Sequence, residues 1–147
     1  MSERARLALF NMVLEDVPGA RVLDAYAGSG ALGIEAMSRG ASEVEFIEKS
    51  PTVAKNISSN LRELGLKARV FTGDAANFTM SEGFDLILAD PPYDDFDLSG
   101  VEYLAGFLKN GGVLALSHPE EAPIIPEMKL MKSRKYAGAH ISVYVKR

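Results

Sequence analysis

The 147-residue sequence contains no cysteine and only two histidines. Without cysteine, disulfide bonds and thiolate metal sites are excluded, and two scattered histidines argue against a zinc site. No apolar run approaches the roughly 20 residues that a membrane span needs, and the polar start Met1-Ser2-Glu3-Arg4 is unlike a signal peptide. We therefore expect a cytoplasmic protein without membrane contact or bound metal, folded as one domain over residues 1–147.

Positive charge is scarce over most of the chain, and the net charge is −4. From Asp85 to Glu127 there are nine acidic residues and one lysine, whereas residues 129–147 hold six basic residues and no acid. Nucleic-acid binding needs Lys and Arg on the contacting face, because phosphate contacts supply much of the affinity. The acidic run and the basic run could each simply form a solvent-exposed face, so charge alone does not identify the binding partner.

Hydrophobic spacing and turn residues predict strands that alternate with helices. The predicted strands are Arg21–Asp24, Glu43–Glu48, Ala68–Thr72, Phe84–Ala89 and Val113–Ser117, followed by a hairpin of roughly Lys129–Tyr136 and His140–Lys146 joined at Ala137-Gly138. The predicted helices are Ser2–Val17 with the stripe Leu7, Phe10, Leu14 and Val17, a helix from the turn Gly28–Gly33 to Gly40, a helix opened by Ser50-Pro51 with the stripe Val53, Ile57, Leu61 and Leu64, and Leu98–Lys109.

This alternation indicates an α/β fold with a mostly parallel sheet and helices on both faces. The terminal hairpin suggests one antiparallel strand inserted near the edge of that sheet. In open sheets of this kind, ligands bind beyond the carboxyl ends of the strands. Four such places carry a carboxylate, and they are Asp24, Glu48, Asp74 and Asp90.

The segment Gly28–Gly33 fits the pattern G-x-G-x-x-G, in which glycines let a ligand approach the backbone at a helix start. A nicotinamide dinucleotide would be one such ligand. However, residues 24–27 separate the strand from the first glycine, and Asp24 would repel a pyrophosphate. A carboxylate there suits a ligand that carries a cation, as the ammonium and sulfonium groups of S-adenosylmethionine do.

Two further acids fit the same ligand. Glu48 can accept hydrogen bonds from both ribose hydroxyls, and Asp74 can accept one from the adenine amino group. Each acid taken alone would also suit a turn or a helix cap, and Asp74 in particular is a plausible N-cap. The combination at consecutive strand ends favours the ligand-binding interpretation.

The segment Asp90-Pro91-Pro92-Tyr93 directly follows an apolar strand. Two prolines would end a strand in any case, but they also hold the main chain rigid and leave its carbonyl oxygens as acceptors. The Asp90 carboxylate and the Pro91 carbonyl can then each accept a hydrogen from one exocyclic amino group. Such a nitrogen is a poor nucleophile, so its positioning and the stabilisation of developing positive charge would drive methyl transfer. Tyr93 would stack on the planar substrate.

These motifs carry a family resemblance. Residues 22–33 (VLDAYAGSGALG), Glu48, Gly73-Asp74-Ala75 and Asp90–Tyr93 together resemble the class I S-adenosylmethionine-dependent methyltransferases. The chain is most similar to the RsmD type, which methylates the exocyclic N2 of a guanine in small-subunit ribosomal RNA. Residues 4–11 (RARLALFN) also resemble that family's arginine-rich first helix. The similarity covers about residues 2–117.

The resemblance implies a Rossmann-like, seven-stranded, mostly parallel sheet whose C-terminal strand is antiparallel, with S-adenosylmethionine as cofactor and RNA, ribosomal or within a ribosomal particle, as partner. The predicted cofactor residues are Asp24, Tyr26, Ala27, Gly28, Gly30, Glu48, Lys49, Asp74, Ala75 and Asp90. The predicted catalytic residues are Asp90, Pro91, Pro92 and Tyr93, and the predicted substrate-binding residues are Arg4, Arg6 and Tyr93.

The sequence departs from the family pattern in two ways. It starts after the point where the family's basic N-terminal hairpin would end, and Leu7 stands where the family commonly has glutamate. Adenine N6, cytosine N4 or a protein glutamine would fit the same motif, so these substrates stay open. A cofactor-binding partner subunit without activity is a further alternative, whereas a nicotinamide-dependent oxidoreductase is disfavoured. The sequence does not indicate an oligomeric state.

Overall fold

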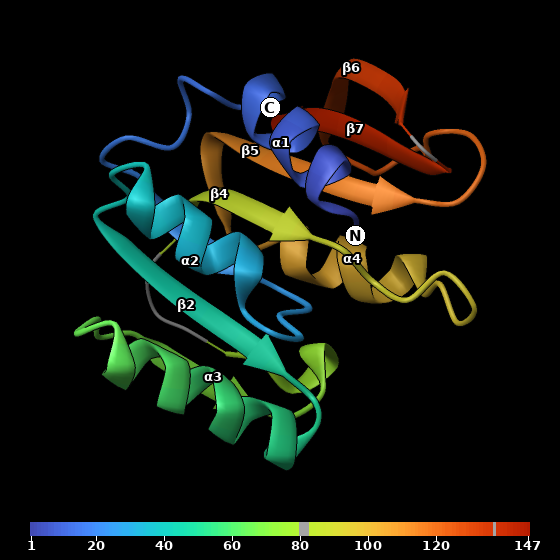
Figure 1. Cartoon of the computed structure of the whole chain (residues 1–147). Helices are drawn as coiled ribbons and strands as arrows, with labels where there is room; N and C mark the ends of the chain where they lie inside the picture. Colours follow the sequence, from blue (N-terminus) through green and yellow to red (C-terminus); the bar gives the residue numbers. More distant parts are fainter. Residues whose placement is uncertain (80–82, 137) are drawn as a thin grey trace.

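A computed structural model describes residues 1–79, 83–136 and 138–147. The described residues form one seven-stranded sheet with the order β3-β2-β1-β4-β5-β7-β6 (Figure 1). The strands are β1 (Arg21–Asp24), β2 (Glu43–Glu48), β3 (Arg69–Thr72), β4 (Phe84–Ala89), β5 (Leu108–His118), β6 (Met128–Tyr136) and β7 (Ala139–Lys146). The helices are α1 (Glu3–Met12), α2 (Ala31–Ser38), α3 (Pro51–Glu63), α4 (Leu98–Ala105) and the short 3-10 helix η1 (Ala75–Asn77).

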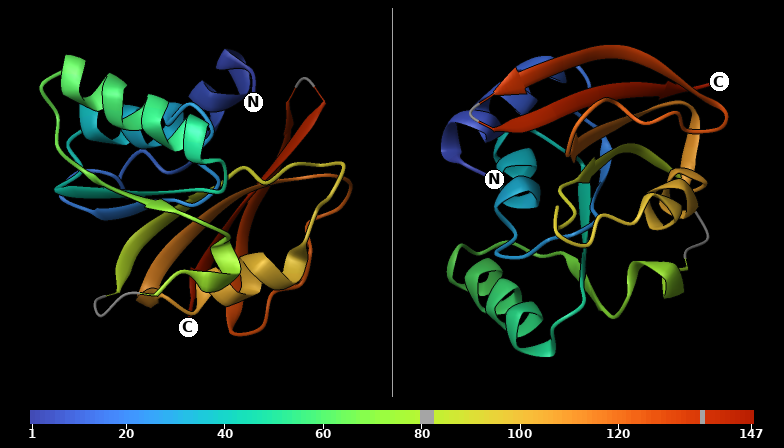
Figure 2. Two further views of the ribbon diagram at one scale, coloured as in Figure 1. Left: turned by 90° about the horizontal axis from the view of Figure 1, so that it is seen from below. Right: turned by 90° about the vertical axis from the view of Figure 1, so that its right-hand side faces the viewer.

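Helices cover both faces of the sheet. Helices α1, α2 and α3 lie on one face, and η1 and α4 lie on the other (Figure 2). Two hydrophobic cores result, one beneath α1–α3 around Phe46 and Leu88, and one beneath η1 and α4 around Phe78 and Ile87. None of the helices in the described residues is both long and apolar enough to cross a membrane. The predicted mostly parallel α/β fold is confirmed.

The C-terminal hairpin is inserted as predicted, with its antiparallel strand inside the sheet. Strand β7 lies between β5 and β6 and runs antiparallel to both. Strand β6 therefore runs in the same direction as β5, and the β6–β7 connection lies at the edge of the sheet where β5 ends. Of the two residues predicted to join these strands, Gly138 has a left-handed backbone (φ 84°), and Ala137 lies outside the described residues.

The predicted apolar stripe of the first helix is partly wrong. Helix α1 ends at Met12, and a turn closed by the Asp16 N–H on the Val13 carbonyl follows, so residues 14–17 do not continue the helical period. As a result Leu7 and Leu14 are exposed (47% and 56%). The buried face consists of Ala5, Ala8, Leu9 and Phe10.

Boundaries of other elements also differ from the prediction, and β5 runs from Leu108 to His118 where Val113–Ser117 was expected. Helix α4 ends at Ala105, because the chain turns at Gly106, and Leu108 and Lys109 already belong to β5. Helix α3 ends at Glu63, which leaves Leu64 beyond the helix and 58% exposed.

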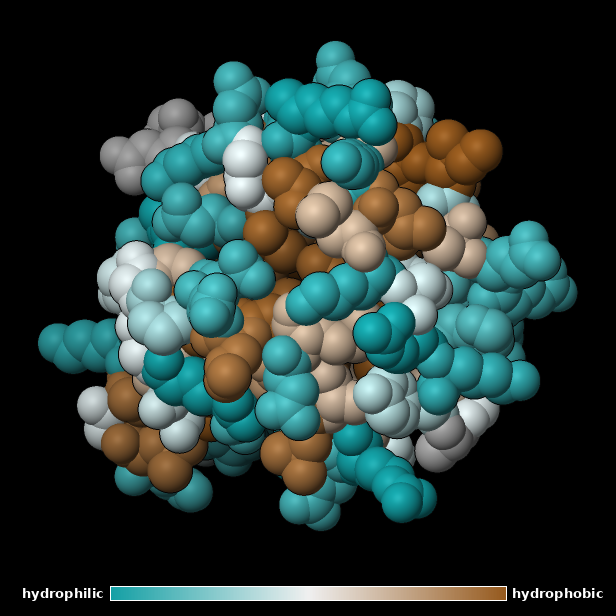
Figure 3. Space-filling view, turned by 90° about the horizontal axis from the view of Figure 1, so that it is seen from above, coloured by the Kyte–Doolittle hydropathy of each residue, from teal (hydrophilic) through white to brown (hydrophobic). Residues whose placement is uncertain are grey.

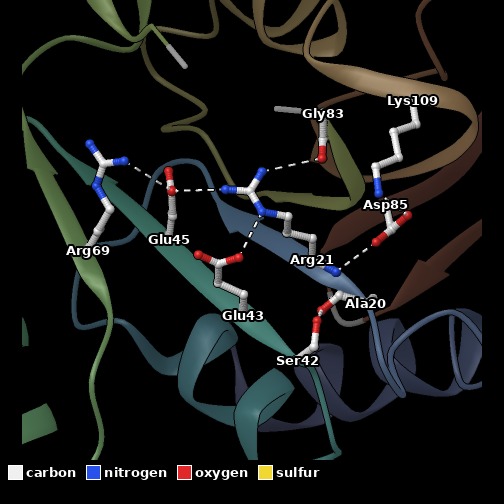
Figure 4. A network of polar contacts seen from close by, with 9 residues as sticks. All are labelled: Ala20, Arg21, Ser42, Glu43, Glu45, Arg69, Gly83, Asp85 and Lys109. Carbon is white, nitrogen blue, oxygen red and sulfur yellow. Dashed lines mark hydrogen bonds and ion pairs between the residues drawn. The ribbon is translucent and has the colours of Figure 1, made fainter. Parts of the chain in front are cut away.

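The edge of the sheet where the parallel strands begin is closed by ion pairs, and we call it the amino-terminal edge. The Arg21 guanidinium lies 2.9 Å from a Glu43 oxygen and 3.3 Å from a Glu45 oxygen. The Arg21 N–H donates to Asp85 at 2.8 Å, and Lys109 lies 3.2 Å from the other oxygen of that carboxylate. Members of this network are Arg21, Glu43, Glu45, Arg69, Asp85 and Lys109 (Figure 4). Each acid of this network lies within 4 Å of an Arg or Lys nitrogen.

Candidate active site

A cavity of about 410 Å³ lies at the opposite edge of the sheet, beyond the carboxyl ends of β1, β2, β3 and β4. Because these strands are parallel neighbours, their ends bring together residues that are far apart in the sequence. The lining residues include the predicted Tyr26, Gly28, Glu48, Lys49, Asp74, Ala75 and Asp90. The prediction that the acids at the ends of β2, β3 and β4 share one site therefore agrees with the geometry.

The fourth acid, Asp24, lies beneath this cavity and not on its wall. Its side chain is fully buried at the end of β1, and one carboxylate oxygen accepts the Gly33 N–H at 2.9 Å. The other oxygen is buried without a hydrogen-bond partner among the described residues. Burial, with the negative charges of Asp90 and Glu48 nearby, raises the pKa of Asp24 to about 7 despite the opposing Gly33 hydrogen bond. Asp24 is thus an unsatisfied buried acceptor that a cationic ligand would stabilise.

The glycine-rich turn brings the backbone close to the cavity. Gly28 has a positive φ of 55°, which favours glycine, and its N–H donates to a Glu48 oxygen at 2.9 Å. Gly33 is required for packing, because a Cβ at this position would overlap the Phe46 ring. Of the predicted cofactor residues in this turn, Ala27 and Gly30 do not line the cavity. Instead, Ala27 donates to the Ile47 carbonyl and accepts from Gly30.

Glu48 and Asp74 both have structural partners in addition to facing the cavity. The second Glu48 oxygen accepts the Ser50 N–H at 2.8 Å, so two amides orient this carboxylate. Asp74 caps η1 by accepting the Ala76 N–H at 2.9 Å. A carboxylate has about four acceptor positions, so both residues keep capacity for a ligand.

A second cavity of about 370 Å³ adjoins the first. Its walls are Met1, Ser2, Asp90, Pro91, Pro92, Tyr93, Ser117, Gly138 and Ala139. Three residues, Asp90, Pro91 and Pro92, line both cavities. The Asp90 side chain is 24% exposed, and the α-amino group of Met1 lies 3.5 Å from its carboxylate. The Asp90 carboxylate is therefore partly accessible where the two cavities meet.

The side chain of Tyr93 is held in place by a residue of β5. Its hydroxyl forms a 2.5 Å hydrogen bond with the hydroxyl of Ser117, which is buried. The tyrosine itself is partly exposed (36%), so its ring stays accessible while its hydroxyl is fixed. Ser117 was not predicted, because only the pairing of β4 with β5 brings it beside the motif.

The remaining predictions have mixed outcomes. Arg4 and Arg6 lie on α1 but do not line either of these cavities. Arg4 is exposed, and the buried Nε of Arg6 has no hydrogen-bond partner among the described residues. Their role in substrate binding stays a prediction. The acidic run after the motif contributes two residues to the wall of the first cavity, Asp95 and Asp97. Asp97 also caps α4. Within the described ranges, no group of three His, Asp or Glu residues could hold a metal ion.

Fold and site together define a Rossmann-like methyltransferase. The family model described as conserved hypothetical protein 95 matches residues 1–145. Relatives in this family are named ribosomal RNA small subunit methyltransferase D. The chain belongs to this family, the RsmD type of methyltransferase.

Individual comparisons agree. The ribosomal RNA small subunit methyltransferase D of Escherichia coli K12 is 37% identical over 146 residues, which cover 97% of this chain and 70% of the relative. The Haemophilus influenzae protein of the same name is 30% identical over 148 residues, covering 92% and 76%. The solved structure of Escherichia coli yhhF has a TM-score of 0.89 at 27% identity, covering 99% of this chain and 86% of that chain.

A more distant structure has the same fold. The magnesium protoporphyrin IX methyltransferase of Synechocystis, solved with S-adenosylmethionine bound, has a TM-score of 0.75 at 15% identity, covering 97% of this chain and 80% of its own. The methyltransferase names of the relatives point to the same cofactor for this chain.

Proposed function

We propose that this protein transfers a methyl group from S-adenosylmethionine to the exocyclic N2 of a guanine in small-subunit ribosomal RNA. The observation that carries this proposal is the wall of Asp90, Pro91 and Pro92 shared by two adjoining cavities. One cavity has the acids suited to a cationic nucleoside, and the other opens toward Tyr93. A methyl donor in the first cavity and an acceptor in the second would therefore meet at Asp90, Pro91 and Pro92.

The residues of the first cavity fit the cofactor. The unsatisfied oxygen of Asp24 is a buried acceptor that suits the ammonium end of S-adenosylmethionine. Glu48 and Asp74 offer acceptor oxygens for the ribose hydroxyls and the adenine amino group. When bound, S-adenosylmethionine supplies the methyl group as a sulfonium.

The motif residues act on the accepting nitrogen. Asp90 accepts one hydrogen of the amino group through its carboxylate, and the Pro91 carbonyl accepts the other. With both hydrogens held, the nitrogen lone pair is directed at the methyl carbon, so the gain is positioning and stabilisation of the positive charge that develops on nitrogen. Asp90 or water then takes the released proton. The Tyr93 ring supports the planar base, with its hydroxyl fixed by Ser117.

The relatives' names support RNA as the substrate class, since they are ribosomal RNA methyltransferases. Guanine N2 is the finer part of the proposal, and it rests on the resemblance to the RsmD type. A cytoplasmic setting belongs to the same proposal. Adenine N6, cytosine N4 and a glutamine amide remain the substrates against which it is tested.

A transfer assay tests the proposal directly. Small-subunit ribosomal RNA and whole small subunits from cells that lack the protein are incubated with the purified chain and methyl-labelled S-adenosylmethionine, and the labelled nucleosides are separated after digestion. We expect N2-methylguanosine. Label in N6-methyladenosine, in N4-methylcytidine or in a protein fraction would overturn the guanine assignment. Thermal stabilisation by NAD but not by S-adenosylhomocysteine would overturn the cofactor assignment.

A further inference from the structure

Strand β6 carries most of the basic run that the sequence places near the C-terminus. Its basic residues are Lys129, Lys132, Arg134 and Lys135, which we call the basic ridge. All four are exposed, and β6 is the outermost strand of the sheet. We infer that the basic ridge binds the phosphate backbone of the RNA substrate outside the catalytic cavity. This inference rests on the proposed function and deepens it.

One residue of the basic ridge, Lys132, interacts electrostatically with the carboxylate of Asp16, and the other three have no such interaction with an acid within the described part of the chain. None of the four residues forms an ion pair there, and the side chains of Lys129 and Lys135 form no hydrogen bond either. The other two contact only backbone carbonyls, Lys132 that of Met12 at 3.4 Å and Arg134 that of Ser133 at 3.2 Å. In contrast, the basic residues of the amino-terminal edge all have a carboxylate partner.

Lys146, a basic residue on the other strand of the hairpin, differs from the residues of the basic ridge. The Lys146 ammonium on β7 donates to the carbonyls of Ala105, Gly106 and Leu108 at 2.9–3.3 Å. These carbonyls lie at the end of α4 and the start of β5, so Lys146 has a structural role. Within the described residues, Lys129, Arg134 and Lys135 have no such partner in another element, and this distinguishes them from structural lysines.

The basic ridge leads toward the site. Because β6 runs in the direction of β5, its last residues lie at the edge of the sheet where the cavities open. Tyr136 pairs with Ala139, which lines the second cavity together with Gly138. Strand geometry gives a length of about 20 Å from Lys129 to Lys135. An RNA strand lying along β6 would therefore reach the cavity of Tyr93.

The basic ridge is flanked by α1. Lys132 and Arg134 pair with Val143 and Ile141, which belong to the core beneath α1–α3, so these two side chains point to the α1 face. Helix α1 lies beside β7 and β6 (Figure 1), and Arg4 on this helix is exposed. Figure 3 views the molecule from above, where α1 and the hairpin lie, and hydrophilic side chains there border a hydrophobic area. Exposed apolar side chains of these elements are Leu7, Leu130 and Met131.

Charge complementarity selects RNA as the occupant. Outside residues 128–147 the chain has twice as many acidic as basic residues, whereas this segment has six basic residues and no acid. A polyanion would be repelled by the surroundings of the site and attracted along β6. Lysines also protect an edge strand from pairing with another chain, but other charged side chains can serve that role too.

The experiment compares two charge variants of the full chain with a matched control. The first variant combines Lys129→Gln, Arg134→Gln and Lys135→Gln, and the second has glutamate at the same three positions, which preserves a charged edge. The control combines Lys55→Gln, Arg62→Gln and Lys67→Gln, three exposed residues on and after α3, which packs against β3, the outermost strand at the opposite end of the strand order. Binding to fluorescent polyuridylate is measured between about 50 and 300 mM KCl, together with kcat, KM and S-adenosylhomocysteine binding.

We expect the glutamine variant to raise the KM for ribosomal RNA about tenfold, with kcat and S-adenosylhomocysteine binding unchanged. Its salt slope, d log K/d log [KCl], should be smaller by about 2, since each lost phosphate contact on a single strand removes about 0.7. The glutamate variant should bind more weakly still while remaining soluble and monodisperse, and the control should match the parent chain.

Three outcomes would overturn the inference, and they show whether the proposed function fails with it. If the parent chain methylates RNA and both variants keep its KM and salt slope, the basic ridge does not bind the substrate and the proposed function stands. If the parent chain methylates a protein and not RNA, the proposed function fails and the inference with it. An equal effect of the control variant would show that net charge, and not the position of the basic ridge, governs binding.

Discussion

The two edges of the sheet use the same residue types in opposite ways. At the amino-terminal edge, Glu43, Glu45 and Asp85 each lie within 4 Å of an Arg or Lys nitrogen (Figure 4). At the carboxyl edge, and among the residues that the structure describes, Asp24 lacks a partner for one buried oxygen, and Glu48 and Asp74 are held by backbone amides alone. The three acids of the amino-terminal edge thus have cations of the chain itself, whereas Asp24, Glu48 and Asp74 form no ion pair within the described residues.

Strand β4 allows this comparison to be tested within one element, because an aspartate lies near each of its ends. The largest effect is expected for Asp90→Asn, which keeps the shape but removes the charge that would stabilise the reacting nitrogen. We expect kcat to fall about 10²–10³-fold, as when one stabilising group is removed from other active sites. The melting temperature and S-adenosylhomocysteine affinity should change little. Parent-like kcat in single-turnover assays would remove Asp90 from the catalytic role.

Asp24→Asn should raise the stability of the ligand-free protein and lower its affinity for the cofactor. Because the pKa of Asp24 is raised from 3.8 to about 7, the ligand-free parent chain loses stability from this group as the pH rises from about 4 to 7. The variant should therefore be more stable at pH 8 by about 2–4 kcal/mol, and the difference should vanish below pH 4. Cofactor affinity should nevertheless fall about 30-fold, since a buried charge partner is lost. Urea unfolding at several pH values and calorimetric titration measure the two effects.

Asp85→Asn is the counterpart at the other end of β4. The hydrogen bond from the Arg21 amide and the Lys109 ammonium lower the pKa of Asp85. A lowered pKa gives stability above the unfolded value of 3.8 that is lost as the pH falls through the folded value. We expect the variant to lose about 1 kcal/mol at pH 7 with kcat unchanged. A lower kcat without a loss of stability would erase the distinction between the two edges.

Ser117→Ala should have the smallest effect. It removes the hydroxyl that fixes Tyr93 and leaves the ring in place. We expect the KM for RNA to rise about threefold, as for the loss of roughly one modest hydrogen bond, with kcat nearly unchanged. Ser117→Thr, which keeps the hydroxyl, should restore most of the affinity. An unchanged KM in both variants would show that the Tyr93 orientation does not depend on Ser117.

Much of this arrangement could be predicted from the sequence, because short-range patterns determine where strands end. The positions of Glu48, Asp74 and Asp90 follow from three strands that are recognisable by composition, and their convergence follows from parallel pairing. The walls contributed by Ser117 and Ala139 depend on β5 and β7 pairing at long range, which no local pattern encodes.

The errors have physical reasons too. Leu7 and Leu14 lie at helical spacing, but α1 ends before the second of them and packs through the small side chains of Ala5 and Ala8. The acidic run at residues 94–97 directly follows the predicted catalytic motif, but its place in the wall of the first cavity was not predicted. The position of these residues depends on α4, which Asp97 caps. Gly100 of this helix lies against the Tyr26 hydroxyl, and this packing brings residues of the acidic run to the first cavity.

The ammonium of Lys146 on three carbonyls at the end of α4 has a consequence for how the protein is made. Helix α4 forms part of the first cavity, yet its C-terminal end is held by a lysine of β7, a strand that follows α4, β5 and β6 in the sequence. During translation, this helix therefore obtains this anchor only after β7 has been synthesised. A nascent chain that still lacks β7 would have the acids for the cofactor without the finished enclosure around them.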